Sequence, residues 1–570
     1  MAGALRGVTH LRLDPWRLAG VALPLALVVP LCAGLLGVLM PAFGIHPGLG
    51  EATLSLAPMQ GLLADASFPR AVSATLISGL GASVLAVAAA FAFCAAVYHT
   101  AWFARVRGSL AAALALPHAS FAVGFAFLIA PSGFLARVIS PELSGWQEPP
   151  DLLIIGDPWA LSLLVALSLK ETLFLILMIT AALGQLPSEA LLRTARSFGY
   201  SPIRAWLTVI APQVYRQVRL PIYAVIAASL GSVDLGLVLG PSAPPTLAPL
   251  ILRWFSDFDL TLQLHAAAGS TVLLALTAVT IGVWRLGERA LGRWGRSRLT
   301  AGARSGGIDV PIAAWGAGLV GLSLIASLMA LIVLALWSFA GQWPWPQATP
   351  QSWTISHWTE ATSNVPVLLS RTVVIAALST VCALILALFA LEAQAGSQQR
   401  RGNAFLFAPL LLPQAGFLFG VTVLWSALRW DGVLGVVVWT HLLFVAPYVY
   451  LALRGPFDAL DPRLERTART LGKSRLETLL AVKAPLLLRP LLTAAAIGFT
   501  ISVTLYLPTI VAGAGRVYTL ATETIALSSG GDRRTLGVVA LVLAALPFAA
   551  LGSALALGAL AARHRAGLQP

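Results

Sequence analysis

The sequence comprises 570 residues, of which 58% are hydrophobic and only 11% are charged, and its mean hydropathy is +0.84. Because soluble domains carry about 25% charged residues, this composition excludes a soluble globular protein. The formal net charge of +14 would favour a nucleic-acid partner in a soluble protein. In a membrane protein the position of the charges matters more than their sum, and we expect no nucleic acid.

Apolar runs recur along the whole chain, and many are longer than the roughly 20 residues that a helix needs to cross a bilayer. We expect spans, in chain order, at 18–40, 72–97, 109–131, 159–184, 220–241, 264–284, 312–340, 372–391, 403–427, 433–453, 490–512 and 536–561. The sequence therefore predicts an all-α, polytopic membrane protein with about twelve transmembrane helices, embedded in a lipid bilayer.

The distribution of basic residues predicts the orientation. With the N-terminus inside, most of the 37 lysines and arginines fall in cytoplasmic segments, and the opposite orientation inverts this ratio. Cytoplasmic loops of membrane proteins carry an excess of Lys and Arg. We therefore expect a multi-pass protein of the bacterial inner membrane with both termini in the cytoplasm. The first span is longer than a signal-peptide core, and we interpret it as a retained anchor.

Three motifs occur twice, in the same order. They are Pro69-x-x-x-Ser73-x-Thr75 with Pro366-x-x-x-Ser370-x-Thr372, Leu116-Pro117-x-Ala119 with Leu412-Pro413-x-Ala415, and Arg193-Thr194-Ala195-Arg196-x-x-Gly199 with Arg466-Thr467-Ala468-Arg469-x-x-Gly472. Their offsets are 297, 296 and 273 residues, so the first copy carries about 23 extra residues (296 minus 273) near 131–158. Such self-similarity is typical of a duplicated fold.

The duplication predicts two parallel six-helix repeats related by an axis along the membrane normal. The first domain is expected at 1–300, with a core at about 69–285, and the second at 301–570, with a core at about 366–562. The polar, arginine-rich stretch 285–309 is predicted to link them.

The third motif forms the longest predicted cytoplasmic loop of each repeat. In both copies a short arginine-rich helix is predicted to end at a glycine, Gly199 or Gly472, because glycine adopts positive φ at no steric cost. A second amphipathic stretch then runs to Pro212 or Pro485. An ordinary basic loop would explain one such segment, but two matching copies indicate a shared function.

At these residues the chain resembles the permeases of binding-protein-dependent ABC importers. Their hallmark is a loop of the form Glu-Ala-Ala-x-x-x-Gly with a proline thirteen residues after the glycine. Both copies keep that spacing and the second alanine. They place arginine at the first position and threonine at the second. The matching residues are Arg193, Thr194, Ala195, Gly199 and Pro212 in the first loop and Arg466, Thr467, Ala468, Gly472 and Pro485 in the second.

The resemblance implies a type I ABC importer permease that carries a small solute across the inner membrane. Each loop would be a coupling helix that docks in a groove of a cytoplasmic ABC ATPase dimer, and a periplasmic solute-binding protein would deliver the solute. ATP would be bound by the partner subunits. The chain itself would need no cofactor.

A closer resemblance is to the fused permeases of ferric-iron and thiamine importers, above all to a thiamine-type group. The residues that carry it are 241–247 after the fifth span, together with 506–516 and 528–534 around and after the eleventh. The identity of the solute stays open.

Charged residues inside spans cost about 2.5 to 3.5 kcal/mol each at a helix centre, so they need a reason. Lys170 and Glu171 lie midway along the fourth span, and Asp234 lies in the fifth, where the second repeat has Thr504. One interpretation is a structural pair of Lys170 with Asp234. The other is that these residues line the translocation path, together with His118 and its equivalent Gln414, which follow the Leu-Pro breaks.

Catalytic and metal-binding patterns are lacking in the sequence. Gly472-Lys473-Ser474 matches only the end of a phosphate-binding loop, since the earlier glycine position is Thr467. The three cysteines lie in apolar spans, as small buried hydrophobes do. We therefore expect no enzyme activity and no metal. The alternative to an ABC permease is a secondary transporter with two six-helix repeats, which would have no reason to keep paired docking loops.

Overall fold

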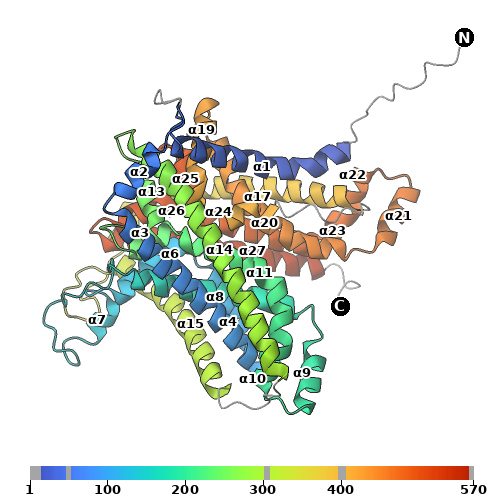
Figure 1. The fold of residues 1–570 in the computed structure, drawn as a ribbon, viewed down its shortest axis with the longest axis horizontal. Coiled ribbons are helices and arrows are strands. Elements are labelled where there is room, and N and C mark those ends of the chain that lie inside the picture. The colour runs from blue at the N-terminus through green and yellow to red at the C-terminus, as the bar shows by residue number, and fades with distance from the viewer. Residues whose placement is uncertain (1–14, 47–52, 301–308, 396–405, 564–570) are drawn as a thin grey trace, which may run out of the picture.

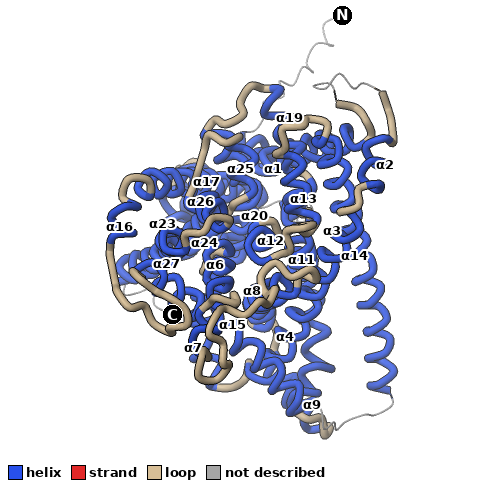
Figure 2. Tube along the Cα trace, turned by 90° about the vertical axis from the view of Figure 1, so that its left-hand side faces the viewer, coloured by secondary structure: helices blue, strands red, loops and turns tan. Residues whose placement is uncertain are grey.

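The computed structural model describes residues 15–46, 53–300, 309–395 and 406–563. Over these residues the protein consists of helices and the loops between them, with one isolated bridge between Ala340 and Trp353. Figures 1 and 2 show a bundle of long helices from which shorter helical segments extend. The predicted all-α class is confirmed.

The elements of the first half are α1 (Pro15–Ala42), α2 (Ala57–Ala64), α3 (Phe68–Thr75), the π-helical turn η2 (Leu76–Leu80), α4 (Gly81–Val97), α5 (Ala101–Ala115), α6 (His118–Ile129), α7 (Phe134–Val138), α8 (Leu161–Leu183), α9 (Ser188–Ser197), α10 (Pro202–Ala205), the π-helical turn η3 (Trp206–Ile210), α11 (Ala211–Leu230), α12 (Asp234–Leu239), α13 (Leu247–Phe255) and α14 (Leu262–Thr300).

The elements of the second half are α15 (Asp309–Phe339), α16 (Ser356–Ala361), α17 (Val365–Gln394), α18 (Ala408–Leu411), the 3-10 turn η5 (Gln414–Gly416), α19 (Leu418–Ala427), α20 (Leu434–Asp458), α21 (Pro462–Thr470), α22 (Arg475–Thr478), the π-helical turn η6 (Leu479–Lys483), α23 (Ala484–Leu486), α24 (Leu488–Thr504), α25 (Leu507–Gly513), α26 (Leu520–Ser528) and α27 (Arg533–Arg563).

The described residues contain nine helices that are long and apolar enough to cross a membrane, or ten if a pair bent by 83° between Leu486 and Leu488 counts as one span. Long continuous helices of the described residues therefore account for nine or ten of the about twelve expected spans, and two of the others are interrupted. The expected span 220–241 is split between α11 and α12, and the described part of 403–427 is split around Pro413. Proline removes a backbone donor and disfavours helical geometry in the preceding residue, so it breaks the latter span.

Part of the predicted linker 285–309 is helical. Residues 285–300 continue α14 as an exposed helix, while 301–308 lie outside the described residues. Residues 285–300 include five arginines and three leucines, which are good helix formers, and these favour a helix despite the three glycines in the same stretch. The domain boundary at residue 300 stays a prediction.

Equivalent positions of the two halves form equivalent structures. The π-helical turns η3 and η6 start at Trp206 and Leu479, which are 273 residues apart. The N–H of Leu247 donates to the Thr75 hydroxyl at 2.8 Å, and the N–H of Leu520 donates to Thr372 at 3.0 Å. The first duplicated motif therefore makes the same contact in both halves.

The first helix of each half packs on the other half. Helix α1 packs against α17 and α19, whereas α15 packs against α4 and α6. Small residues permit this close approach, because a Cβ on Gly124 of α6 would lie 2.6 Å from the carbonyl oxygen of Ala330 in α15. At the equivalent crossing Gly420 of α19 meets Gly34 of α1. The halves are thus interlocked rather than merely adjacent.

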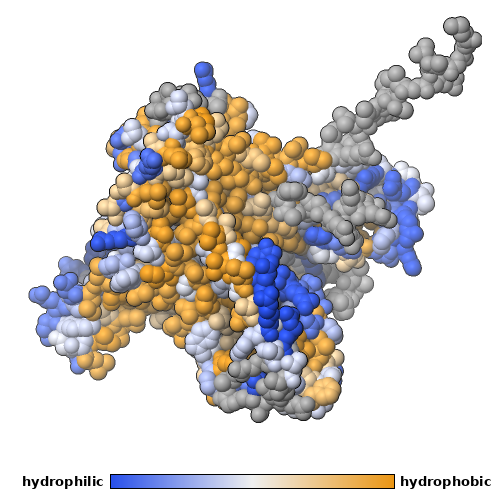
Figure 3. Space-filling model, viewed as in Figure 1, coloured by the Kyte–Doolittle hydropathy of each residue, from blue (hydrophilic) through white to orange (hydrophobic). Residues whose placement is uncertain are grey.

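The surface is apolar over the helical bundle and polar at its ends (Figure 3). Side chains such as Val279, Ile325 and Leu555 are exposed on the long helices, as lipid-facing residues are. Hydrophilic residues gather around α7 at one end and around α21 and the end of α14 at the other. This distribution fits a bundle that crosses a bilayer.

Candidate functional site

The first repeated loop (residues 188–212) has the helix–turn–helix geometry that the sequence predicts. Helix α9 ends at Ser197, and Gly199 follows with φ of +86°. The N–H of Gly199 donates to the carbonyl of Arg196 at 3.0 Å, which satisfies one of the carbonyls left free at the helix end. Helix α10 then begins at Pro202, a residue whose fixed φ suits a first helical turn.

The second repeated loop (residues 461–485) repeats this geometry. Asp461 caps α21 by accepting the N–H of Arg463 at 2.8 Å, and Gly472 has φ of +85°. Ser474 and Glu477 form a capping box at the start of α22. The two glycines therefore adopt the left-handed conformation that only glycine reaches without strain.

The two loops expose the same kinds of side chain. Ala195 and Ala468 are buried, whereas Arg193, Thr194, Arg466 and Thr467 are exposed. The residue directly before each glycine is large, apolar and exposed, with 62% of Phe198 and 76% of Leu471 accessible. Exposed apolar side chains at one place on two equivalent loops are a feature of interaction sites.

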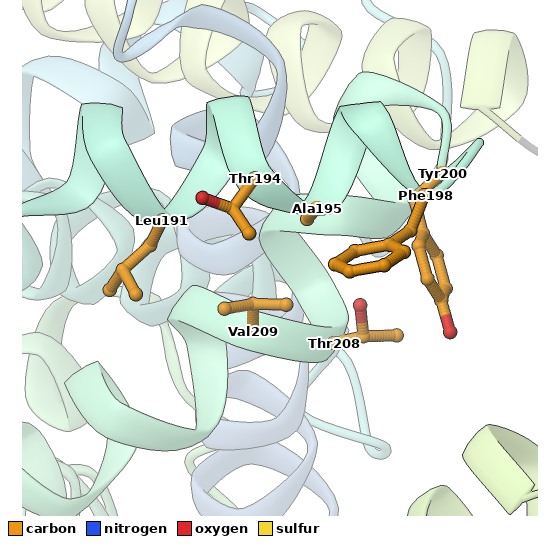
Figure 4. A pocket seen from close by; sticks show the side chains of 7 residues that line it. All are labelled: Leu191, Thr194, Ala195, Phe198, Tyr200, Thr208 and Val209. Atoms are coloured by element: carbon orange, nitrogen blue, oxygen red, sulfur yellow. The ribbon is translucent and has the colours of Figure 1, made fainter.

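A hollow of about 280 Å³ lies beside the first repeated loop. Figure 4 shows Leu191, Ala195 and Phe198 on one side of it, opposite Val209 and Thr208 of the π-helical turn. Thr194 and Tyr200 complete its lining. The loop thus offers a largely apolar recess next to an exposed aromatic ring.

Lys170 does not pair with Asp234, so that interpretation is corrected. Its ammonium group donates to the carbonyls of Ala113 and Leu116 at 3.1 and 2.8 Å. It also lies 5.4 Å from the ring of Phe121. Pro117 has no N–H to offer the carbonyl four residues earlier, so the break between α5 and α6 leaves acceptors that Lys170 satisfies.

The structure brings together three of the other predicted path residues. Nδ1 of His118, at the start of α6, lies 4.0 Å from Oδ2 of Asp234, at the start of α12. The side chain of His118 is 45% exposed although its neighbours Pro117 and Ala119 are buried. The buried Glu171, in the middle of α8, is within electrostatic range of Asp234. The three residues form a polar cluster whose accessible member is His118.

Two tyrosines of the second half lie near this cluster. Tyr448 of α20 is within electrostatic range of Glu171, and Tyr506, which precedes α25, is within that range of Asp234. Sequence reasoning missed both, because a tyrosine in an apolar span gives no sign of its neighbours. Among the described residues no three His, Cys, Asp or Glu side chains are placed to hold one metal ion.

The remaining predicted residues lie near the corresponding breaks of the second half, but the predicted equivalence of Asp234 and Thr504 is wrong. Asp234 begins α12 and Leu507 begins α25 at the offset of 273 residues, so Leu507 holds the equivalent position. Gln414 begins η5 directly after Pro413, and Thr504 ends α24 with its hydroxyl bonded to the carbonyl of Ile501 at 2.7 Å. Nearby, the fully buried His441 bonds Ser502 and Thr509 at 2.8 and 2.9 Å through its two ring nitrogens. Sequence reasoning missed this histidine, since the first half has Ser168 at the equivalent position.

An all-helical membrane bundle with two interlocked halves and a pair of exposed helix–glycine loops defines a transport permease. No family model matches the chain. The chain is 32% identical over 498 residues to the inner membrane ABC transporter permease protein YnjC of Escherichia coli strain K12, covering 87% of this chain and 89% of that protein. The chain therefore belongs to the inner membrane ABC transporter permeases.

This membership fixes the general function. The protein is a multi-pass permease subunit of an ABC transporter in the inner membrane, a transport subunit that works with ATPase subunits. The comparison gives no support to a secondary transporter.

Proposed function

We propose that the chain is the permease of a binding-protein-dependent importer, and that each repeated loop docks on one subunit of a cytoplasmic ATPase dimer. The docking residues are those at which the motif repeats: Arg193, Thr194, Ala195, Gly199 and Pro212, with Arg466, Thr467, Ala468, Gly472 and Pro485. The observation that carries the proposal is the pair of exposed apolar residues, Phe198 and Leu471, each placed before a glycine of positive φ. Burying such side chains favours association.

The orientation follows as part of the proposal. Both repeated loops and both described chain ends lie toward the same side of the bundle in Figure 1, away from α7. With the loops on the ATPases, both termini face the cytoplasm and α7 faces the periplasmic binding protein.

The polar cluster of His118, Glu171 and Asp234 is proposed to line the translocation path, with Gln414 and Thr504 at the equivalent breaks of the second half. The accessible His118 supports this assignment, as does the position of the cluster where helices from both halves meet. Lys170 contributes to the path indirectly, because it bonds the backbone carbonyls of Ala113 and Leu116 at the Pro117 break. We retain the ferric-iron and thiamine type as the proposed subtype.

Copurification tests the docking role. A Phe198→Ser, Leu471→Ser double variant should lose most of the ATPase that copurifies with the wild type, while its abundance in the membrane is unchanged. Leu143→Ser is the matched control, because Leu143 is 83% exposed in the external loop and should retain the ATPase. Full retention by the double variant would refute docking through these loops.

A further inference from the structure

A buried ion cluster lies under the second repeated loop. Its centre is Glu392, near the end of α17, whose side chain is 1% exposed. Nε of Arg475 in α22 lies 3.1 Å from one carboxylate oxygen of Glu392, and Nζ of Lys483 in η6 lies 2.7 Å from the other. Lys483 also bonds Glu465 of α21 at 2.7 Å. One carboxylate of a membrane-crossing helix is thus joined to three elements of the loop.

The cluster extends to the first helix of the chain. The guanidinium of Arg475 lies 4.7 Å from the ring centre of Trp16 in α1, and Lys483 lies 5.3 Å from that of Phe457 in α20. A cation above an aromatic face is attracted to it. The second repeated loop is therefore tied to α1, α17 and α20 together.

Glu392 is an unfavourable residue at this place unless it is paired. A carboxylate near the C-terminal end of a helix opposes the helix dipole, and a buried carboxylate loses its hydration. Arg475 offsets both effects, since it bonds the side chain of Glu392 and also its backbone carbonyl. The ion pair with Arg475 therefore offsets the cost of burying the Glu392 carboxylate at the end of α17.

The first repeated loop has no counterpart of this cluster. The positions equivalent to Glu392, Lys483, Arg475 and Glu465 are occupied by Ala95, Ile210, Pro202 and Leu192. At the first loop the fully buried Trp206 is set edge-on against Phe91 at 6.0 Å. The halves share the shape of the loop but differ in how it is attached.

We propose that Glu392 is a positioning residue that fixes the second repeated loop to α17 and, through Arg475, to α1, so that loop and helices move as one unit. The residues of this particular cluster are not repeated at the equivalent positions of the first half. The consequence for transport rests on the proposed function. When an ATPase subunit docked on this loop moves, α17 and α1 move with the loop and transmit the motion to the translocation path.

Limited proteolysis of the full-length permease in detergent tests the attachment without any partner. Trypsin has sites in both loops, such as Arg193 in the first and Arg466 in the second, and tags at both chain ends identify the fragments. Glu392→Gln should raise the cleavage rate in the second loop by roughly tenfold or more and leave that in the first unchanged. Equal rates in wild type and variant, at both loops, would overturn the proposal.

Two further variants distinguish a loss of loop attachment from general misfolding. Lys483→Met removes the link between Glu392 and Glu465 but leaves Arg475 on Glu392, so cleavage of the second loop should rise less than in Glu392→Gln. Glu477→Gln is the matched control, because Glu477 lies in the same loop and its carboxylate accepts the N–H of Ser474 at the start of α22. Faster cleavage in this control to the same degree would overturn the specific role of Glu392.

Spin labels give a second measurement. With Cys32, Cys94 and Cys382 replaced by alanine, a label pair at Leu378→Cys on α17 and Thr470→Cys in the second loop should show one narrow distance distribution when Glu392 is kept and a broad one with Glu392→Gln. A narrow distribution in both proteins would contradict the proposal. If Glu392→Gln loosens the loop but the Phe198→Ser, Leu471→Ser double variant retains its ATPase, the attachment stands and the docking role fails. If instead the double variant loses its ATPase but Glu392→Gln leaves the loop unchanged, the docking role stands and the attachment is rejected.

Discussion

Substitution of Gly472 by valine isolates the contribution of one backbone conformation to docking. Gly472 has φ of +85°, and a Cβ built on it would meet no atom within 4 Å. The substitution therefore creates no clash in the folded protein. Its cost comes from the left-handed conformation alone, which places the Cβ of an L-residue close to its own backbone.

The size of the effect follows from this conformation. The left-handed region costs an L-residue about 1 to 2 kcal/mol, and a β-branched residue falls at the upper end of this range. Since 1.4 kcal/mol is a factor of ten, the native turn should become about 5- to 30-fold less favoured. Gly199, with φ of +86°, should respond alike. The costs of the two substitutions should add, because the sites lie in separate loops.

Retention of the ATPase by the purified permease measures the loss. The double Gly199→Val, Gly472→Val variant should retain much less ATPase than the wild type at equal abundance in the membrane. Gly199→Asn, Gly472→Asn is the matched control, because asparagine tolerates the left-handed region better than other non-glycine residues, and it should retain more than valine. Wild-type retention by the valine variant would refute the assignment of the glycine turns to docking.

Three further predictions concern the helix breaks and the orientation. Asp234→Asn should lower uptake of the solute bound by the partner binding protein while membrane abundance stays normal, and unchanged uptake would show that its charge is dispensable. Lys170→Met should lower the melting temperature in detergent, because it leaves the carbonyls at the Pro117 break unsatisfied, at a cost of about 1 to 3 kcal/mol each. An unchanged melting temperature would mean that other donors reach them. Cysteines placed at Phe198 should react with membrane-impermeant reagents only from the cytoplasm, and those at Leu143 only from outside; the opposite pattern would invert the proposed orientation.

Features that depend on local sequence could be predicted well. The glycine turns follow from the freedom of Gly199 and Gly472, and the breaks follow from Pro117 and Pro413. The repeat strengthened both predictions, because each glycine and each proline has an equivalent in the other half. The hydropathy of the chain established the helical membrane class, since a buried backbone in lipid must satisfy its hydrogen bonds within helices or closed barrels.

Contacts between distant elements could not be predicted in the same way. Helices that are apolar on all sides carry no periodicity that identifies a partner helix. The hydropathy pattern therefore could not predict that α1 packs on the second half. The target of Lys170 was missed for a related reason. A charge in a span suggested an opposite charge, whereas the acceptors it satisfies are backbone carbonyls, which every residue has.

The ion cluster under the second repeated loop shows where reasoning from repeats fails. Comparison of the halves identifies what they share, and Glu392 has only Ala95 at the equivalent place. The expected span also ended at residue 391, one position before it. Comparison of the halves therefore does not identify charged residues that lack a counterpart. Such residues can nevertheless make two similar loops respond differently to the same partner. The shared glycines point to a common docking geometry, and the unshared charges point to the difference in attachment.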